Sequence, residues 1–184
     1  MKINQQDSSH LVVLCKQQNQ KAQFEIYNRY CKAMYNVALR IVKDQHFAED
    51  IMQESFLKAF TKIDSYQGDV SFGAWLKRIT INCSIDFYKK NNKNYLEDYN
   101  NAVASVPEIT EQNQECSDLQ DLKTQHLLAA LMALKESYRV VLTLFYIEGY
   151  DQEEISQIVG ISDSNCRTTL CRAKEKLRSN LMQL

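Results

Sequence analysis

The chain has 184 residues, 45% of them hydrophobic, and a formal net charge of −1. This length suits one medium domain or two small ones, and 4 glycines and 1 proline interrupt the chain seldom enough to favour helices. No apolar run approaches the roughly 18–20 residues of a membrane span, and no signal peptide precedes the first expected helix. We therefore expect a soluble, cytoplasmic protein without stable membrane insertion.

The 6 cysteines and 3 histidines do not indicate a disulfide framework or a metal site. No two cysteines form a C-x-x-C pair and the histidines lie far apart in sequence, so we expect small buried thiols. The sequence also contains no glycine-rich phosphate loop and no nucleophile elbow. It therefore predicts no catalytic residue, no metal and no cofactor, and we expect a protein that is not an enzyme.

Apolar residues recur at helical spacing through the N-terminal part of the chain. This spacing predicts four helices, over about residues 9–20, 21–43, 48–63 and 71–90. Ser71 is the expected cap of the fourth helix. The stretch over residues 91–121 is polar and acidic and holds the only proline, which indicates a flexible linker. Helical spacing resumes near Leu127.

The third expected helix carries a polar strip on its exposed side. Asp50, Gln53 and Glu54 share this strip, beside Phe56 and Leu57. Acids in the first turns of a helix and lysines in the last suit its dipole, so a solvated surface explains the strip as well. The alternative is that the strip docks a helix of another protein.

The fourth expected helix mixes aromatic and basic residues. Trp75, Phe87 and Tyr88 lie among Lys77, Arg78, Lys89 and Lys90, with Asn82 between them. Because bases stack on aromatic rings while cations follow phosphates, this mixture favours single-stranded nucleic acid. A core position is the better interpretation for Trp75 and Phe87. Both interpretations stay open for Tyr88 and the lysines.

Residues 150–177 predict a helix-turn-helix. Ile155, Ile158 and Val159 would bury one side of a short helix, and Gly160 can take the left-handed conformation that ends it. A second helix follows, with either Ser162 or Asp163 as its cap.

The second helix of this motif has an apolar side and a basic, hydroxylic side. Its inner face would hold Cys166, Leu170, Ala173 and Leu177. The residues that we expect to contact DNA are Ser164, Arg167, Thr168, Thr169, Arg172 and Lys174. Such a helix fits the major groove, whereas a helical hairpin with a solvated charged face is the alternative.

The net charge of −1 is low for a protein that binds DNA by itself, because phosphate contacts carry much of the affinity. The charge is segregated, with basic residues in the fourth and last helices and acids in the linker. This distribution predicts weak DNA binding by the chain alone, with a larger assembly supplying the rest.

Three stretches, in this order, resemble bacterial RNA polymerase sigma factors of the sigma-70 family, in the extracytoplasmic-function (ECF) group. They are DQHFAEDIMQESFLKAF, SFGAWLKRITINCSIDFYKK and the terminal helix-turn-helix. The resemblance covers about residues 10–181. It implies a transcription initiation factor that binds core RNA polymerase, directs it to specific promoters, recognises two promoter elements and stabilises the opened strand.

The resemblance also implies roles by position. The residues expected to bind polymerase are Asp50, Gln53, Glu54 and Phe56. The residues expected at the melted strand of the minus-ten element are Lys77, Arg78, Asn82, Tyr88, Lys89 and Lys90, with Asn82 at an extruded base. The helix-turn-helix would read the minus-thirty-five element in duplex DNA, and the linker acids would mimic RNA phosphates in the polymerase. An anti-sigma factor is a further implied partner.

We therefore expect an all-α protein with two small helical domains. Residues 1–93 would form the polymerase-binding and minus-ten domain, 94–123 a flexible acidic linker, and 124–184 the helix-turn-helix domain. A stand-alone regulator of the response-regulator type would need a receiver domain or ligand pocket that the sequence does not show. A protein-interaction module without a DNA role leaves the basic helix unexplained.

Overall fold

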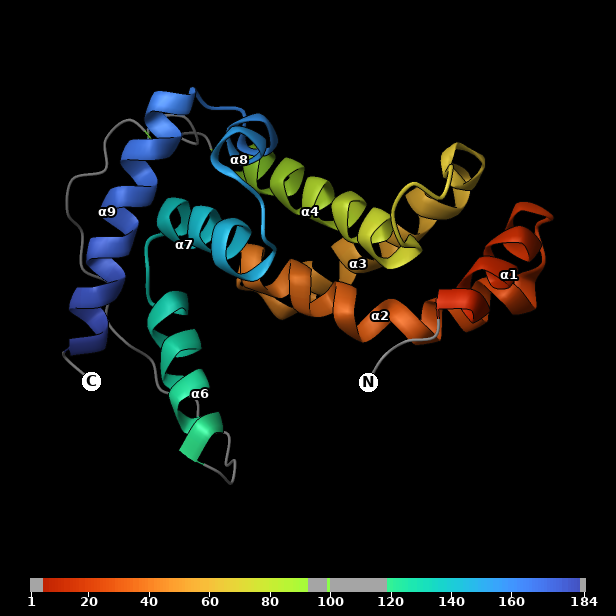
Figure 1. Cartoon of the computed structure of the whole chain (residues 1–184), viewed down its shortest axis with the longest axis horizontal. Helices are drawn as coiled ribbons and strands as arrows, with labels where there is room; N and C mark the ends of the chain where they lie inside the picture. The colour runs from red at the N-terminus through yellow and green to blue at the C-terminus, as the bar shows by residue number, and fades with distance from the viewer. Residues whose placement is uncertain (1–4, 93–98, 100–118, 183–184) are drawn as a thin grey trace. The chain divides into compact units, whose positions relative to one another are not determined.

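The computed structural model describes residues 5–92, 99 and 119–182, and leaves out the side chains of 5–8 and 119–123. The chain divides into two compact units, Met1–Asn91 and Asn92–Leu184. All regular structure in the described residues is helical (Figure 1), which confirms the predicted all-α class with two domains. Most of the expected linker over 94–123 lies outside the described residues.

The N-terminal unit is built on three helices that pack against one another. Its helices are α1 (Gln5–Lys16), α2 (Gln20–Val42), α3 (Gln45–Thr61), the short 3-10 helix η1 (Ile63–Ser65) and α4 (Phe72–Asn91). Helices α2, α3 and α4 contact each other pairwise, and α1 packs on α2. The core between them includes Ile26, Met34, Phe56 and Leu76. These contacts fix which sides of α3 and α4 stay exposed.

Capping side chains set where these helices begin. The side-chain Oδ1 of Asn19 accepts hydrogen bonds from the backbone amides of Lys21 and Ala22 at 3.0 and 3.2 Å. Asp44 accepts from the Phe47 amide at 3.0 Å, so α3 begins three residues earlier than its apolar stripe. Ser71 accepts from the Ala74 amide at 3.3 Å, which confirms Ser71 as the predicted cap of α4.

Within residues 119–182, the C-terminal unit contains four α-helices and one π-helical segment. They are α6 (Leu119–Met132), α7 (Glu136–Leu142), the π-helical segment η2 (Thr143–Ile147), α8 (Gln152–Val159) and α9 (Asp163–Met182). Helix α9 packs against α6, α7 and α8. Helix α6 begins at Leu119, inside the stretch predicted as linker, and the predicted domain bounds stay a prediction. Leu119 and Leu122 have helical spacing, but most residues around them are polar, so the sequence alone does not indicate this start.

Across residues 5–92 and 119–182, none of the helices combines the length and apolar character that crossing a membrane requires.

Candidate nucleic-acid interface

Helix α8 has a defined beginning and end. The Asp151 carboxylate accepts a hydrogen bond from the Glu154 amide at 2.8 Å, and the Asp151 amide donates to the Glu154 carboxylate at 3.0 Å. This capping box satisfies two amides that the helix leaves free. The helix ends at Gly160, with φ 76° and ψ 40°. Since glycine has no Cβ to oppose this left-handed conformation, the predicted stop at Gly160 is confirmed.

Side chains at the turn join α8 to α9. The Ser162 hydroxyl accepts a hydrogen bond from the Asn165 amide at 3.2 Å, so Ser162 caps α9. Asp163 has a different role, because its carboxylate accepts a hydrogen bond from the Ser156 hydroxyl of α8 at 2.5 Å. The two helices are therefore linked by a hydrogen bond across the turn.

Helix α9 separates a buried face from an exposed one. Cys166, Leu170 and Ala173 are buried, as predicted. The exposed residues in its first half include Ser164, Arg167, Thr168 and Arg172. The Thr168 hydroxyl donates to the Ser164 carbonyl at 2.9 Å and keeps its lone pairs available as acceptors. This face offers two guanidinium groups and two hydroxyls, which can bind base edges and phosphates.

Two residues expected on this face lie elsewhere. Thr169 is only 1% exposed, so the structure offers no exposed Thr169 side chain for the predicted DNA contact. It lies three residues after Cys166, and this spacing turns it toward the same buried side. Lys174 is half-buried, with its ammonium 4.5 Å from the ring centre of Phe145 and 5.4 Å from that of Tyr146. These cation–π contacts hold Lys174 against η2.

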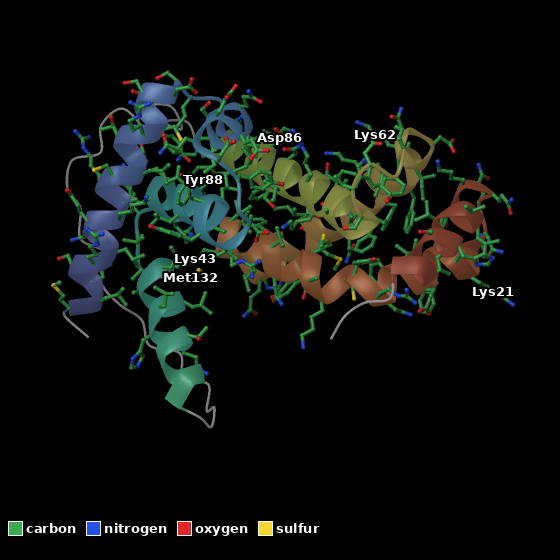
Figure 2. All side chains as sticks on the ribbon, in the orientation of Figure 1. Lys21, Lys43, Lys62, Asp86, Tyr88 and Met132 are labelled. Carbon is green, nitrogen blue, oxygen red and sulfur yellow. The ribbon has the colours of Figure 1, made fainter. Side chains whose placement is uncertain are left out.

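On α4, Arg78, Asn82 and Lys89 lie on one side of the helix, at spacings of four and seven residues. Arg78, Asn82 and Lys90 are exposed and Lys89 is half-buried. Asp86, labelled in Figure 2, is exposed on this same side of α4. We call Arg78, Asn82 and Lys89 the α4 strip.

Tyr88 does not belong to the exposed surface. It is 6% exposed, although we expected it among the residues that contact the melted strand. Tyr88 and Lys89 are adjacent, so their side chains leave the helix about 100° apart. The Tyr88 side chain therefore points away from the α4 strip.

A pocket of about 710 Å³ lies beside the start of α4. Its lining includes Tyr30 and Met34 from α2, Tyr66, Asp69 and Ser71 from the loop before α4, and Lys77 from α4. The pocket thus combines aromatic faces, a carboxylate, a hydroxyl and an ammonium. We did not predict it, because its walls come from segments far apart in the sequence.

Two aromatic residues that line this pocket, Tyr66 and Phe72, pack against each other and against Trp75. The ring centre of Tyr66 lies 5.6 Å from that of Phe72 and 5.3 Å from that of Trp75. Trp75 is half-buried in this cluster, so its interpretation as a core residue is the better one. Burial, with Tyr30 and Asp69 nearby, raises the pKa of Tyr66. Its hydroxyl therefore stays protonated and donates to the Val70 carbonyl at 2.6 Å, which closes the loop.

Gly73 permits the close approach of α4 to α2. A Cβ at this position would lie 2.9 Å from the Tyr30 ring. Any larger residue would therefore push Tyr30 out of the pocket wall.

Helix α3 exposes the predicted polar strip. Asp50, Gln53 and Glu54 are exposed, and Glu54 forms an ion pair with Lys58 at 2.7 Å. Phe56, which we expected to contact polymerase, is 3% exposed, and its ring centre lies 4.9 Å from that of Tyr27 in the core. Leu57 is the apolar residue that the strip presents, with 69% exposure. We call Asp50, Gln53, Glu54 and Leu57 the α3 strip.

Comparison with known proteins assigns both units. Residues 26–94 match the family described as Sigma-70 region 2, and residues 124–177 match Sigma-70, region 4. ECF RNA polymerase sigma factor SigM of Bacillus subtilis is 31% identical over 156 residues, which are 84% of this chain and 92% of SigM. SigW of the same organism is 30% identical over 177 residues, which are 92% of this chain and 94% of SigW.

This chain belongs to the ECF group of sigma-70 factors. It is therefore a transcription initiation factor that binds core RNA polymerase and directs it to promoters. The region 2 match contains the α3 strip and the α4 strip, and the region 4 match contains the helix-turn-helix.

Solved structures share the fold of this sigma factor. The sigma factor RpoE from Bartonella quintana, in complex with the anti-sigma factor NepR, has a TM-score of 0.54 and 23% identity, over 86% of this chain and 95% of RpoE. CnrH in complex with the cytosolic domain of CnrY has a TM-score of 0.53 and 22% identity, over 94% of this chain and 96% of CnrH.

Proposed function

We propose that this sigma factor reads two promoter elements with separate surfaces, α9 for duplex DNA and α4 for the opened strand. The observation that carries the proposal is the division of α9. Its apolar side is buried against neighbouring helices, while Arg167, Thr168 and Arg172 stay exposed on the other side. Because its apolar side packs on neighbouring helices, α9 can enter the major groove with its exposed side without losing this packing.

We assign the opened strand to α4 and the pocket beside it. Arg78, Asn82 and Lys89 would follow the strand, while an extruded base enters the pocket lined by Tyr30, Tyr66 and Asp69. Extruding a base costs a few kcal/mol of stacking, which a pocket with aromatic walls and polar groups can offset. This assignment gives Lys77 a position at the pocket wall rather than on the α4 strip.

The α3 strip is the proposed contact to core polymerase. It presents an exposed leucine, Leu57, among acidic and amide groups. On binding, this leucine would become buried with polar contacts around it, which is a common arrangement at protein interfaces. We assign the polymerase contact to Leu57 in place of Phe56.

The remaining assignments follow from the family. As an initiation factor the chain acts through binding and is not an enzyme, and it works in the cytoplasm with the polymerase. RpoE and CnrH were each solved with a partner, the anti-sigma factor NepR and the cytosolic domain of CnrY. We propose an anti-sigma factor as a further partner of this chain.

In vitro transcription on a library of genomic fragments tests this function. Core polymerase with the protein should start transcripts at fragments that share two sequence elements, at a constant distance from each other. Core polymerase alone is the control. Transcription from fragments that share only one sequence element would contradict the two-surface proposal.

A further inference from the structure

Helix α1 forms part of the wall of the pocket beside α4. Ser9 and Val12 of α1 line this pocket together with residues of α2, α4 and the loop before α4. Val12 is buried in the core of the N-terminal unit, so α1 is fixed against the neighbouring helices. Helix α1 ends at Lys16, before the region 2 match begins at residue 26, so the match itself assigns α1 no role.

The last residue of α1 holds the loop that begins on the other side of the pocket. The Lys16 ammonium donates a hydrogen bond to the Tyr66 carbonyl oxygen at 3.0 Å, and α1 also packs against η1, which leads into this loop. Residues 66–71 have no regular secondary structure, and we call them the pocket loop. All of the pocket loop except Gln67 lines the pocket. Lys16 therefore binds the backbone of a segment that shapes the pocket.

Tyr66 carries this restraint into the rest of the pocket loop. Its hydroxyl donates a hydrogen bond to the Val70 carbonyl at 2.6 Å, and its ring packs edge-on against Phe72, with ring centres 5.6 Å apart. Gly68, between these contacts, has φ 89°, and no neighbouring atom of the described residues lies within 4 Å of the place where a Cβ would be. The middle of the pocket loop is therefore not packed on the helices, and Tyr66 sets its position.

We propose that α1 orders the pocket loop for the opened strand, with Lys16 as the positioning residue. This inference rests on the proposed binding of an extruded base in the pocket. Lys16 acts through the backbone of Tyr66 and needs no contact with DNA. Because a loop that is already held in its bound conformation loses less entropy when the base enters, the Lys16 hydrogen bond raises the affinity for the opened strand.

A purely structural role for Lys16 is the alternative. Lys16 lies in the last turn of α1, where a cation also interacts favourably with the helix dipole. Loss of that interaction would weaken α1 and would lower DNA binding whether or not a base enters the pocket. A positioning role instead requires that the effect of Lys16 depends on the extruded base.

Single-stranded DNA with and without the base separates these two roles. Holoenzyme is assembled from the full chain and core polymerase. Fluorescence anisotropy then measures its affinity for a labelled non-template oligonucleotide that carries the minus-ten element of a promoter from the fragment library. An abasic site, which keeps the phosphates, replaces each nucleotide of the element in turn. The wild type should lose affinity at the position whose base enters the pocket.

Matched variants test the part played by Lys16. Lys16→Met keeps an unbranched side chain and removes the ammonium, so it should weaken binding of the intact oligonucleotide about three- to tenfold, the range for one hydrogen bond. Binding of the oligonucleotide with the abasic site at the pocket position should stay unchanged. Lys16→Arg keeps a donor and should restore the affinity. Lys21→Met, at an exposed lysine near the beginning of α2 and outside the pocket lining (Figure 2), should bind both oligonucleotides as the wild type does.

The outcomes distinguish this inference from the proposed function. If the wild type loses affinity at one abasic position, but Lys16→Met weakens the intact and the abasic oligonucleotide equally or weakens neither, the positioning role of Lys16 is overturned. If no abasic site weakens binding by the wild type, the proposed pocket for an extruded base is contradicted instead.

Discussion

Arg167 and Arg172 leave the same helix in different directions. Their spacing of five residues separates them by about 140° around α9, so they cannot share one base pair. Both are exposed, and Arg167 lies nearer the helix N-terminus, which usually enters the groove in helix-turn-helix proteins. We assign Arg167 to a base edge and Arg172 mainly to a phosphate, with Ser164 and Thr168 making shorter contacts.

Substitution separates these two roles. Arg167→Ala should relax the preference at one upstream position by about 1–3 kcal/mol, the discrimination of a bidentate arginine–guanine contact. Arg172→Ala should weaken transcription from all promoters alike and lower the salt dependence of DNA binding, because a phosphate contact carries no sequence information. Transcription of a mutant promoter library with each variant measures both effects. An unchanged sequence preference with Arg167→Ala would show that the assignment is wrong.

Single-residue burial was the hardest property to predict. Phe56 and Thr169 each belong to the edge of an apolar stripe. Sequence spacing gives the direction of a side chain around its helix, but it does not give how much of the helix surface the neighbouring elements cover. The half-burial of Lys174 depends on Phe145 and Tyr146, which lie almost thirty residues earlier in the chain. Such pairs become visible only when the packing of α9 on η2 is known.

At the scale of elements, helix ends were better predicted than helix contacts. Ser71 and Gly160 each act on backbone groups within a few residues, so local sequence was sufficient for both predictions. The pocket joins residues of α1, α2 and the loop before α4, and no single segment carries its pattern. The π-helical segment Thr143–Ile147 was also missed, since its apolar sequence reads as ordinary helix.

The turn between α8 and α9 depends on the conformation of Gly160. Gly160→Ala places a Cβ at φ 76°, so we expect a loss of about 1 kcal/mol of unfolding free energy, measured by thermal unfolding. Gly160→Asn should lose less, because asparagine tolerates the left-handed region. Gln157→Ala, on the exposed side of α8, is the matched control. Equal stability of wild type and Gly160→Ala would mean that the turn relaxes at no cost.

The α3 strip can be tested without disturbing the helix. Asp50→Ala with Gln53→Ala removes two exposed side chains and no core contact, so helicity should stay unchanged. We expect affinity for core polymerase to fall by about tenfold or more, since central interface residues contribute more than about 1 kcal/mol each. Fluorescence anisotropy measures the affinity. Asp64→Ala removes an exposed acid outside the strip and should bind as the wild type does.

At the scale of the whole molecule, charge decides how much DNA binding the chain can support alone. The 22 basic residues are outnumbered by 23 acidic ones. Binding of duplex DNA releases counterions in proportion to the phosphates that cations neutralise, and an acidic chain loses part of that gain to repulsion. The exposed cations of α9 can therefore position the helix on a promoter but cannot replace the polymerase.

The free chain should consequently bind a duplex minus-thirty-five fragment weakly. We expect a Kd of about 1–100 μM at physiological salt, the range typical of non-specific binding, with affinity falling steeply as salt increases. Adding core polymerase should produce tight binding that depends on promoter sequence, because the two partners then contribute contacts together. Anisotropy with labelled duplex at two salt concentrations, with and without polymerase, measures both states. Nanomolar, sequence-dependent binding by the free chain would place it with stand-alone DNA-binding regulators in its mode of action.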